Sequence, residues 1–347
     1  MFRHHPLSRA LPVVPVSLKK ALALGLLAGF LYSFSGPSAA AESAKAYPSS
    51  PVKIVVGFPP GNATDTVARL LASRLEPLLG QPFVVDNRAG AAGSIGTGQV
   101  AKAKPDGYTL LVGSNGTLAI NPNLHDNLPY EPVRDFAPVS LLVSLPMYVV
   151  VHPDVPANTI PELVELAKKN PGEYAYGSSG NGSANHLAAA VLANTAGLDI
   201  MHVPYKGSGP ALTDLIGGRL TMMVDTAPAV MQAVKAGQVK VLAVTKPTRS
   251  LAFPEVPTVA EQGYEGFDVQ AWLGLAAPSG TPQEVQDKLA KAVTKIMQDP
   301  AFKESVTAVG AEPEGTTPEQ FSQYLRNEIQ RWGGVIDTLG LKDKPAQ

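Results

Sequence analysis

VKIVVGFPPGNATDTVARLLASRLEPLLG (52–80) combines a strand pattern, a glycine-bearing turn and a helix pattern. The β-branched run at its start predicts a strand over 52–58. Apolar residues then recur at spacings of three and four, which predicts an amphipathic helix over 65–79 that ends at Gly80. A glycine-bearing turn ahead of a helix N-terminus is how α/β proteins bind anions. No lysine follows this turn and the chain has no GK dipeptide, so the turn is not a nucleotide-binding P-loop.

The same alternation of strands and helices continues along the chain. Further strands are expected at 82–87, 108–114, 139–153 (one or two strands), 173–179, 199–206, 219–226, 239–245 and 268–278. Further helices are expected at 93–105, 161–170, 182–197, 209–218, 228–237, 282–298, 300–309 and 317–339. This alternation predicts an α/β fold with parallel sheets flanked by helices. A chain of 347 residues is long enough for roughly two domains.

The N-terminal residues have the composition of a targeting segment. Four Lys or Arg residues precede the apolar stretch ALALGLLAGFLYSF (21–34). The motif SAAAE (38–42) offers a cleavage site after Ala41, and a second candidate site ends at Ala46. We therefore expect 1–41 to be a cleaved signal peptide and the mature protein to be periplasmic. The alternative is an uncleaved membrane anchor. The chain contains no cysteine, and hence neither disulfides nor a lipid-modified cysteine.

Small residues dominate the loops that follow the expected strands. Such loops lie at 57–65, 87–94, 113–117, 177–186, 205–211 and 225–229. In an α/β sheet they gather at the carboxyl ends of the strands, where ligands bind. Gly, Ser, Ala and Thr side chains let a ligand approach the main-chain N–H groups, and each helix N-terminus stabilises an anion by about 0.3–1 kcal/mol. The pattern favours a site for a small anion, although the same residues are also ordinary turn and capping residues.

Motifs of catalysis, metal binding and nucleic-acid binding are absent from the sequence. It has no cysteine nucleophile, no G-x-S-x-G and no H-E-x-x-H, and no His pair has the spacing of metal ligands. Ser183 and His186 are one helical turn apart, but we interpret His186 as a polar group of a first helical turn rather than a general base. A net charge of −1 without a basic stripe gives no reason to expect nucleic acid. We predict a binding protein without cofactor or metal.

Five blocks of sequence resemble one family in the same order. They read VKIVVGFPPGNATDTVARLLA, VVDNRAGAAGSIGTGQVAKAKPDGYTLLVGS, YGSSGNGSANHLAAAVL, VPYKGSGPALTDLIGGRL and QAWLGLAAPSGTP. These blocks resemble the Bug (Bordetella uptake gene) family, the periplasmic solute-binding proteins of tripartite tricarboxylate transporters. The resemblance covers roughly 47–340. It implies a monomeric protein of two α/β domains around a ligand cleft, one formed by 47–147 plus 268–347 and the other by 148–267.

The resemblance also implies a function and a set of ligand-binding residues. The protein would capture a small organic carboxylate and deliver it to integral membrane transporter subunits. A periplasmic protein that signals to a sensor kinase is the alternative, and a hydrolase of the cleft is a remote one. The implied ligand-binding residues are Phe58, Pro59, Gly61, Asn62 and Thr64 on one wall, Ser178, Ser179, Gly182, Ser183 and His186 on the other, and Ser114, Tyr205, Lys206 and Asp225.

Several positions leave the chemical identity of the ligand undecided. In the resembled family the first loop usually reads PPGG or PAGG, whereas here Asn62 replaces the second glycine and could narrow the pocket or add a donor and an acceptor. Asp65 next to it is expected to favour the positive helix end and pair with Arg69, with ligand contact as the alternative. An ionised Asp225 facing the ligand would favour an amino or hydroxyl group and repel a second carboxylate. Dicarboxylates, aromatic carboxylates and acidic amino acids therefore all remain candidates.

Overall fold

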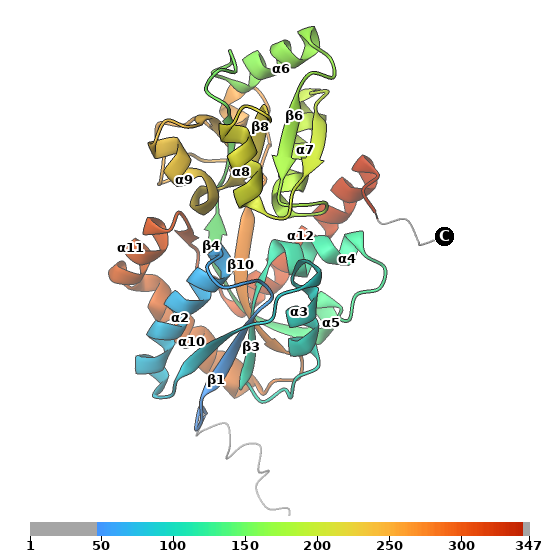
Figure 1. Cartoon of the computed structure of the whole chain (residues 1–347). Helices are drawn as coiled ribbons and strands as arrows, with labels where there is room; N and C mark the ends of the chain where they lie inside the picture. Colours follow the sequence, from blue (N-terminus) through green and yellow to red (C-terminus); the bar gives the residue numbers. More distant parts are fainter. Residues whose placement is uncertain (1–46, 343–347) are drawn as a thin grey trace, which may run out of the picture. The chain divides into compact units, whose positions relative to one another are not determined.

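The structure, a computed structural model, describes residues 47–342 (Figure 1). The expected signal peptide at 1–41 and both of its cleavage sites lie outside this range. Within 47–342, no helix is long and apolar enough to cross a membrane.

The first sheet has six strands in the order β11-β4-β10-β3-β1-β2. They are β1 (Val52–Val56), β2 (Phe83–Asn87), β3 (Thr109–Ser114), β4 (Phe136–Leu145), β10 (Ala271–Pro278) and β11 (Glu312–Pro313). β1, β2, β3 and β4 run in one direction, whereas β10 and β11 run in the other. β10 lies beside β4 along most of its length (Figure 1).

The second sheet has five strands in the order β7-β6-β8-β5-β9. They are β5 (Met147–Val151), β6 (Ala175–Ser178), β7 (Met201–Pro204), β8 (Met222–Thr226) and β9 (Lys240–Val244). β5 is antiparallel to both of its neighbours, and the other four strands run in one direction. The chain passes from the first sheet to the second between β4 and β5, and returns between β9 and β10.

The strand directions are mainly parallel, as the alternation of strands and helices predicts, with β5, β10 and β11 as the exceptions. The crossover rule fixes direction only where a helix links two strands of the same sheet. β5 follows β4 across the single residue Pro146, and β10 comes after the second passage between the sheets. Neither link is a crossover within one sheet, so the sequence pattern could not give the direction of these strands.

The helices cover both sheets, and the long ones lie where the sequence predicts them. The α-helices, long and short, are α2 (Ala63–Leu79), α3 (Ser94–Ala101), α4 (Asn121–Leu124), α5 (Pro132–Asp135), α6 (Ile160–Lys169), α7 (Ala184–Ala196), α8 (Ser208–Ile216), α9 (Ala227–Lys235), α10 (Gln283–Gln298), α11 (Pro300–Ala308) and α12 (Pro318–Leu339). The sequence analysis did not anticipate α4, α5 or the π-helical segment Gly116–Ile120. These are single turns or irregular helix, too short to produce a periodic apolar pattern.

Helix α2 shows how the sequence fixes an element that bears the site. Asn62 caps its N-terminus, which is why the helix begins two residues before the predicted start. Val67, Leu71 and Leu75 are fully or almost fully buried and hold one face against the sheet. Gly80 ends the helix in a left-handed conformation with a φ of 76°.

Candidate functional site

The turn between β1 and α2 is held by a reciprocal pair of hydrogen bonds. The Asn62 Oδ1 atom accepts from the Asp65 amide at 2.8 Å, and the Asp65 Oδ2 atom accepts from the Gly61 amide at 2.9 Å. Asp65 is only 2% exposed and also binds Arg69 and Asn87. Burial alone would raise the pKa of Asp65, but hydrogen bonds from Arg69, the Gly61 amide and Asn87 outweigh it and lower the pKa. The predicted Asp65–Arg69 pair is present, so the Asp65 carboxylate is used within the protein.

The start of α2 leaves hydrogen-bond donors uncommitted. Within residues 47–342, the amides of Ala63 and Thr64 have no acceptor, and neither does the Thr64 hydroxyl. Thr64 is 5% exposed, and its hydroxyl without a partner keeps some contact with solvent. Uncommitted donors at a helix N-terminus suit an anion, because the helix dipole adds to the hydrogen bonds. The Asn62 side chain shapes this turn as a cap.

Phe58 lies in this turn, and Ser114 ends the neighbouring strand β3. A Cβ atom on Gly93 would lie 2.6 Å from the Thr117 methyl and 3.1 Å from the Phe58 ring, so only glycine lets the 87–94 loop close against Phe58. Ser114 and Thr117 exchange hydrogen bonds between their amides and hydroxyls. The Ser114 hydroxyl therefore stabilises the start of the π-helical segment. Pro59 is exposed beside Phe58.

The turn between β6 and α7 is organised by Asn185, which the sequence analysis did not single out. Its Oδ1 atom accepts from the amide and the hydroxyl of Ser179 and from the Ser183 hydroxyl. Its Nδ2 atom donates to the Asp225 Oδ2 atom at 2.8 Å. The signal for Asn185 was present in the sequence: it is a polar residue on the buried face of an otherwise Ala- and Leu-rich helix. The Ser178 hydroxyl donates to the Gly180 carbonyl in the same turn.

Asp225 lies at the end of β8 and is 4% exposed. Burial raises the pKa of Asp225, although hydrogen bonds from Ser208, Thr226 and Asn185 oppose that shift. Its Oδ1 atom accepts from the Thr226 amide at 2.8 Å, and its Oδ2 atom accepts from Asn185. Both carboxylate oxygens thus have partners within the protein.

Tyr205 and Lys206 differ in how they are placed. The Tyr205 hydroxyl donates to the Asp214 Oδ2 atom at 2.7 Å, which directs it toward α8. The Tyr205 amide donates to the Ser178 carbonyl and ties the β7–α8 loop to the β6–α7 turn. Lys206 is exposed.

His186 is part of a stack of rings rather than of a catalytic pair. Its ring lies 3.9 Å from the His202 ring, and His202 in turn stacks on Tyr176 at 4.9 Å. The His186 Nδ1 atom accepts from the Gly182 amide at 3.1 Å. Burial and the neighbouring His202 lower the pKa of His186 to about 4, so the ring is neutral at pH 7. The Ser183 hydroxyl donates to the Gly180 carbonyl, not to the His186 ring, and therefore has no base beside it.

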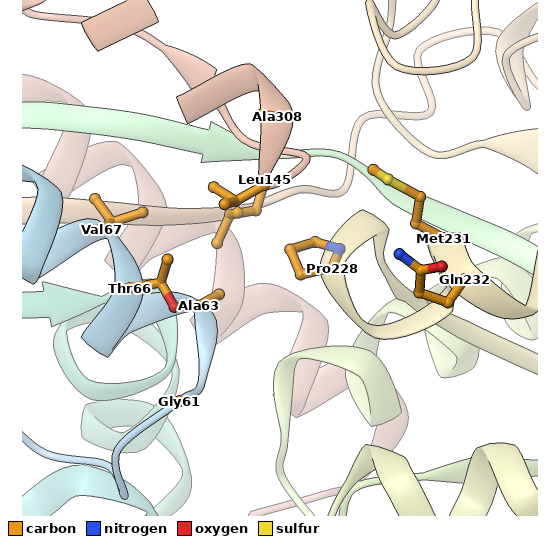
Figure 2. A pocket seen from close by; sticks show the side chains of 10 residues that line it. Gly61, Ala63, Thr66, Val67, Leu145, Pro228, Met231, Gln232 and Ala308 are labelled. Carbon is orange, nitrogen blue, oxygen red and sulfur yellow. The ribbon is translucent and has the colours of Figure 1, made fainter. Parts of the chain in front are cut away.

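The candidate residues fall into two groups, one after the strands of each sheet. Two cavities touch these groups. The first, of 240 Å³, is lined by the start of α2 and by α9 and the end of α11, and it includes Gly61 (Figure 2). The second, of 640 Å³, includes Gly182 and His186 and is also lined by the ends of α4 and α12. Gly182 packs on Leu124 of α4, since a Cβ atom there would lie 2.6 Å from the Leu124 Cδ1 atom.

Metal binding has no support in the described part of the chain. Among residues 47–342 no group of three His, Cys, Asp or Glu side chains is arranged to hold a metal ion.

Comparison with known proteins identifies the family. The model of the tripartite tricarboxylate transporter family receptor matches residues 67–341. The chain belongs to this family. BugT of Bordetella pertussis is 40% identical over 307 residues, which cover 88% of this chain and 94% of BugT. The resemblance to the Bug proteins is thereby confirmed.

Two solved structures are similar to this chain in fold as well as in sequence. An R. palustris protein solved with adipate is 36% identical, with a TM-score of 0.79 over 85% of this chain and 99% of that chain. MatC from Rhodopseudomonas palustris, solved with malate, is 34% identical, with a TM-score of 0.74 over 84% of this chain and all of that chain. The periplasmic binding protein BugD is 39% identical, with a TM-score of 0.76 over 86% of this chain and all of that chain, so the fold is that of periplasmic binding proteins. The receptor family consists of solute-binding proteins rather than enzymes.

Proposed function

We propose that this protein captures a small organic carboxylate in the periplasm and presents it to the membrane subunits of a tripartite tricarboxylate-type transporter. The observation that carries the proposal is the pair of uncommitted helix starts. The free amides of Ala63 and Thr64 follow β1 of the first sheet. In the second sheet, the Ala184 amide at the start of α7 also has no acceptor among the described residues. The family description favours delivery to a transporter over signalling to a sensor kinase.

One carboxylate of the ligand would be held by neutral donors. The amides of Ala63 and Thr64 and the Thr64 hydroxyl would bind it from the α2 side, and the Ser178–Ser183 turn would approach from the α7 side. A helix N-terminus contributes about 0.3–1 kcal/mol to an anion, and up to ~2 kcal/mol where the site is partly buried. Several such donors can hold a carboxylate without a lysine or arginine. Phe58 and Pro59 would add an apolar wall.

Asp225 in this proposal positions the ligand-binding turn and does not contact the ligand. Its two oxygens are occupied by Thr226 and Asn185, and Asn185 holds Ser179 and Ser183. The Asp225 oxygens therefore do not need a donor from the ligand, and a dicarboxylate is not excluded for lack of one. Relatives solved with adipate and malate, both dicarboxylates, support this ligand class.

The two sheets would belong to two domains that close on the ligand. We propose 47–147 plus 268–347 as one domain and 148–267 as the other, with the hinge at the two passages between the sheets. Residues 1–41 would direct export and then be removed as a signal peptide. The protein would act as a monomer, without cofactor or nucleic acid.

Calorimetry with Thr64→Val tests the proposal. The wild-type protein is titrated with succinate, malate, adipate, aspartate and benzoate at concentrations up to millimolar. Valine keeps the shape of Thr64 but removes its hydroxyl, and the loss of a hydrogen bond to a charged group costs about 1.5–3 kcal/mol, or roughly 10- to 150-fold in affinity. Thr294→Val, the same change on the exposed face of α10, should leave affinity unaltered. Absence of binding by every carboxylate would overturn the proposal.

A further inference from the structure

The cavity beside the start of α2 has an apolar lining. We name this 240 Å³ cavity the α2–α9 pocket. Its walls are Val67 of α2, Leu145 at the end of β4, Pro228 and Met231 of α9, and Val309 after α11 (Figure 2). Thr66 and Gln232 are its polar side chains, and no charged side chain lines it within the described chain. A charged group inside this pocket would lose hydration without gaining a charged partner, so the part of a ligand that lies inside it must be uncharged, with any charged end at the open rim.

The α2–α9 pocket borders the turn that bears the proposed carboxylate site. Gly61 and Ala63 line the pocket, and the free Ala63 and Thr64 amides lie in the same turn. A ligand whose carboxylate is held by these amides therefore has the pocket next to its first carbon atoms. Gln232, on the opposite side of the pocket from Gly61 in Figure 2, is exposed and can donate its side-chain N–H to a second polar end.

The volume of the pocket limits the size of the occupant. An enclosed apolar cavity of about 150 Å³ is enough to hold a benzene molecule. A half-open pocket of 240 Å³ can therefore take an apolar body of at least four carbons, the number of methylene groups in a six-carbon diacid. Met231 can adapt to it, because an unbranched thioether fills irregular space. Its methyl lies against Gly310, where a Cβ atom would be 3.0 Å away.

We propose that the α2–α9 pocket selects carboxylates with an uninterrupted apolar body, such as six-carbon aliphatic diacids, over four-carbon ones. This inference rests on the proposed function and specifies its ligand. A methylene group gains about 0.8 kcal/mol on burial, which corresponds to about fourfold in affinity. Affinity should therefore rise with chain length until the pocket is full, and then stop rising.

The test is calorimetry with succinate, glutarate, adipate and pimelate on the wild type, Ala308→Leu and Ala301→Leu. Ala308 is exposed and lines the pocket, so a leucine there fills space that the chain would use without disturbing the core. Ala301 is exposed on the same helix and does not line the pocket, which makes it a matched control. We expect up to about fourfold tighter binding for each methylene from succinate to adipate in the wild type and in Ala301→Leu. In Ala308→Leu the gain for each methylene should largely disappear.

Two results would overturn the inference and leave the proposed function standing. One is succinate binding as tightly as adipate. The other is a chain-length series in Ala308→Leu that equals that of the wild type. If none of the four diacids binds at millimolar concentration, the inference and the diacid form of the proposed function both fail.

Discussion

Asn185 is the residue on which the second group of candidate residues depends. One side chain joins Ser179, Ser183 and Asp225, three positions that the sequence motif presents as separate. The motif GSSGNGSANH therefore describes a turn whose serine side chains bond mainly to the protein itself, leaving main-chain donors for a ligand.

Asn185→Ala should destabilise the protein by about 1–3 kcal/mol, because it leaves the buried Asp225 carboxylate without its Nδ2–H donor. Urea unfolding measures the change. The matched control is Asn194→Ala on the same helix, where the side chain is exposed and the change should lie within about 0.5 kcal/mol. Equal free energies of unfolding for the two variants would show that the Asn185–Asp225 hydrogen bond does not contribute to stability.

Asp225→Asn separates a positioning role from direct contact with the ligand. If Asp225 acts through Asn185, the affinities for succinate and aspartate should fall by a similar factor, since both ligands use the same turn. Calorimetry on both ligands provides the comparison. A loss confined to aspartate, with succinate held or improved, would show instead that Asp225 faces the ligand.

The sequence predicted some of these residues from local chemistry and missed others. The Asp65–Arg69 pair follows from i,i+4 spacing on a helix, and it is present. The cap formed by Asn62 was not predicted, because the apolar spacing placed the helix start at Asp65, two residues too late for Asn62 to be its N-cap. The partnership of Asn185 with Asp225 spans 40 residues and two elements, and no local pattern encodes such a contact.

Elements were more predictable than contacts between them. Helices such as α2 and α10 bury one face at spacings of three and four, and that pattern is readable in the sequence. The two-residue strand β11 and the single-turn helices α4 and α5 are too short for any period. The antiparallel direction of β5 and β10 depends on where the chain passes between the sheets, which is a property of the tertiary fold.

The stacked rings of α7, β6 and β7 predict a loss of stability in mild acid. The pKa of His186 is about 4 in the folded protein and 6.5 unperturbed, so between these values the unfolded chain binds more protons. The free energy of unfolding should therefore decrease as pH falls from about 6.5 to about 4, by up to about 3 kcal/mol from His186. The lowered pKa of His202 acts in the same direction.

Two buried carboxyl groups contribute to stability with a pH dependence that differs from that of His186. Asp225, whose pKa is raised, adds stability as pH falls toward its unfolded value. Asp65, whose pKa is lowered, reduces the free energy of unfolding only when the pH falls below its unfolded pKa.

Thermal unfolding of the wild type and of His186→Phe between pH 7 and 4.5 isolates the histidine contribution, since phenylalanine keeps a stacked ring but takes up no proton. A wild-type profile no steeper than that of His186→Phe would contradict the account.

For the whole molecule, the two passages between the sheets are the proposed hinge. Glu312 of β11 binds Lys246 and Ser250 in the segment after β9, and so links the edge of the first sheet to the chain leaving the second. The order of the longer strands and helices along the chain could be predicted from the sequence. How far the loops of one sheet approach those of the other could not, because it depends on packing such as Gly182 on Leu124 and Gly310 on Ala227.

The central claim is that this protein carries a small organic carboxylate. Mass spectrometry of the small molecules released by denaturing the full-length gene product, purified from the periplasm of its native cells, tests it most directly. The account predicts a carboxylate that is released chemically unchanged and binds again to the refolded protein at a 1:1 ratio. Release of a nucleotide, a metal ion or a molecule without a carboxylate, in the same stoichiometry, would contradict it.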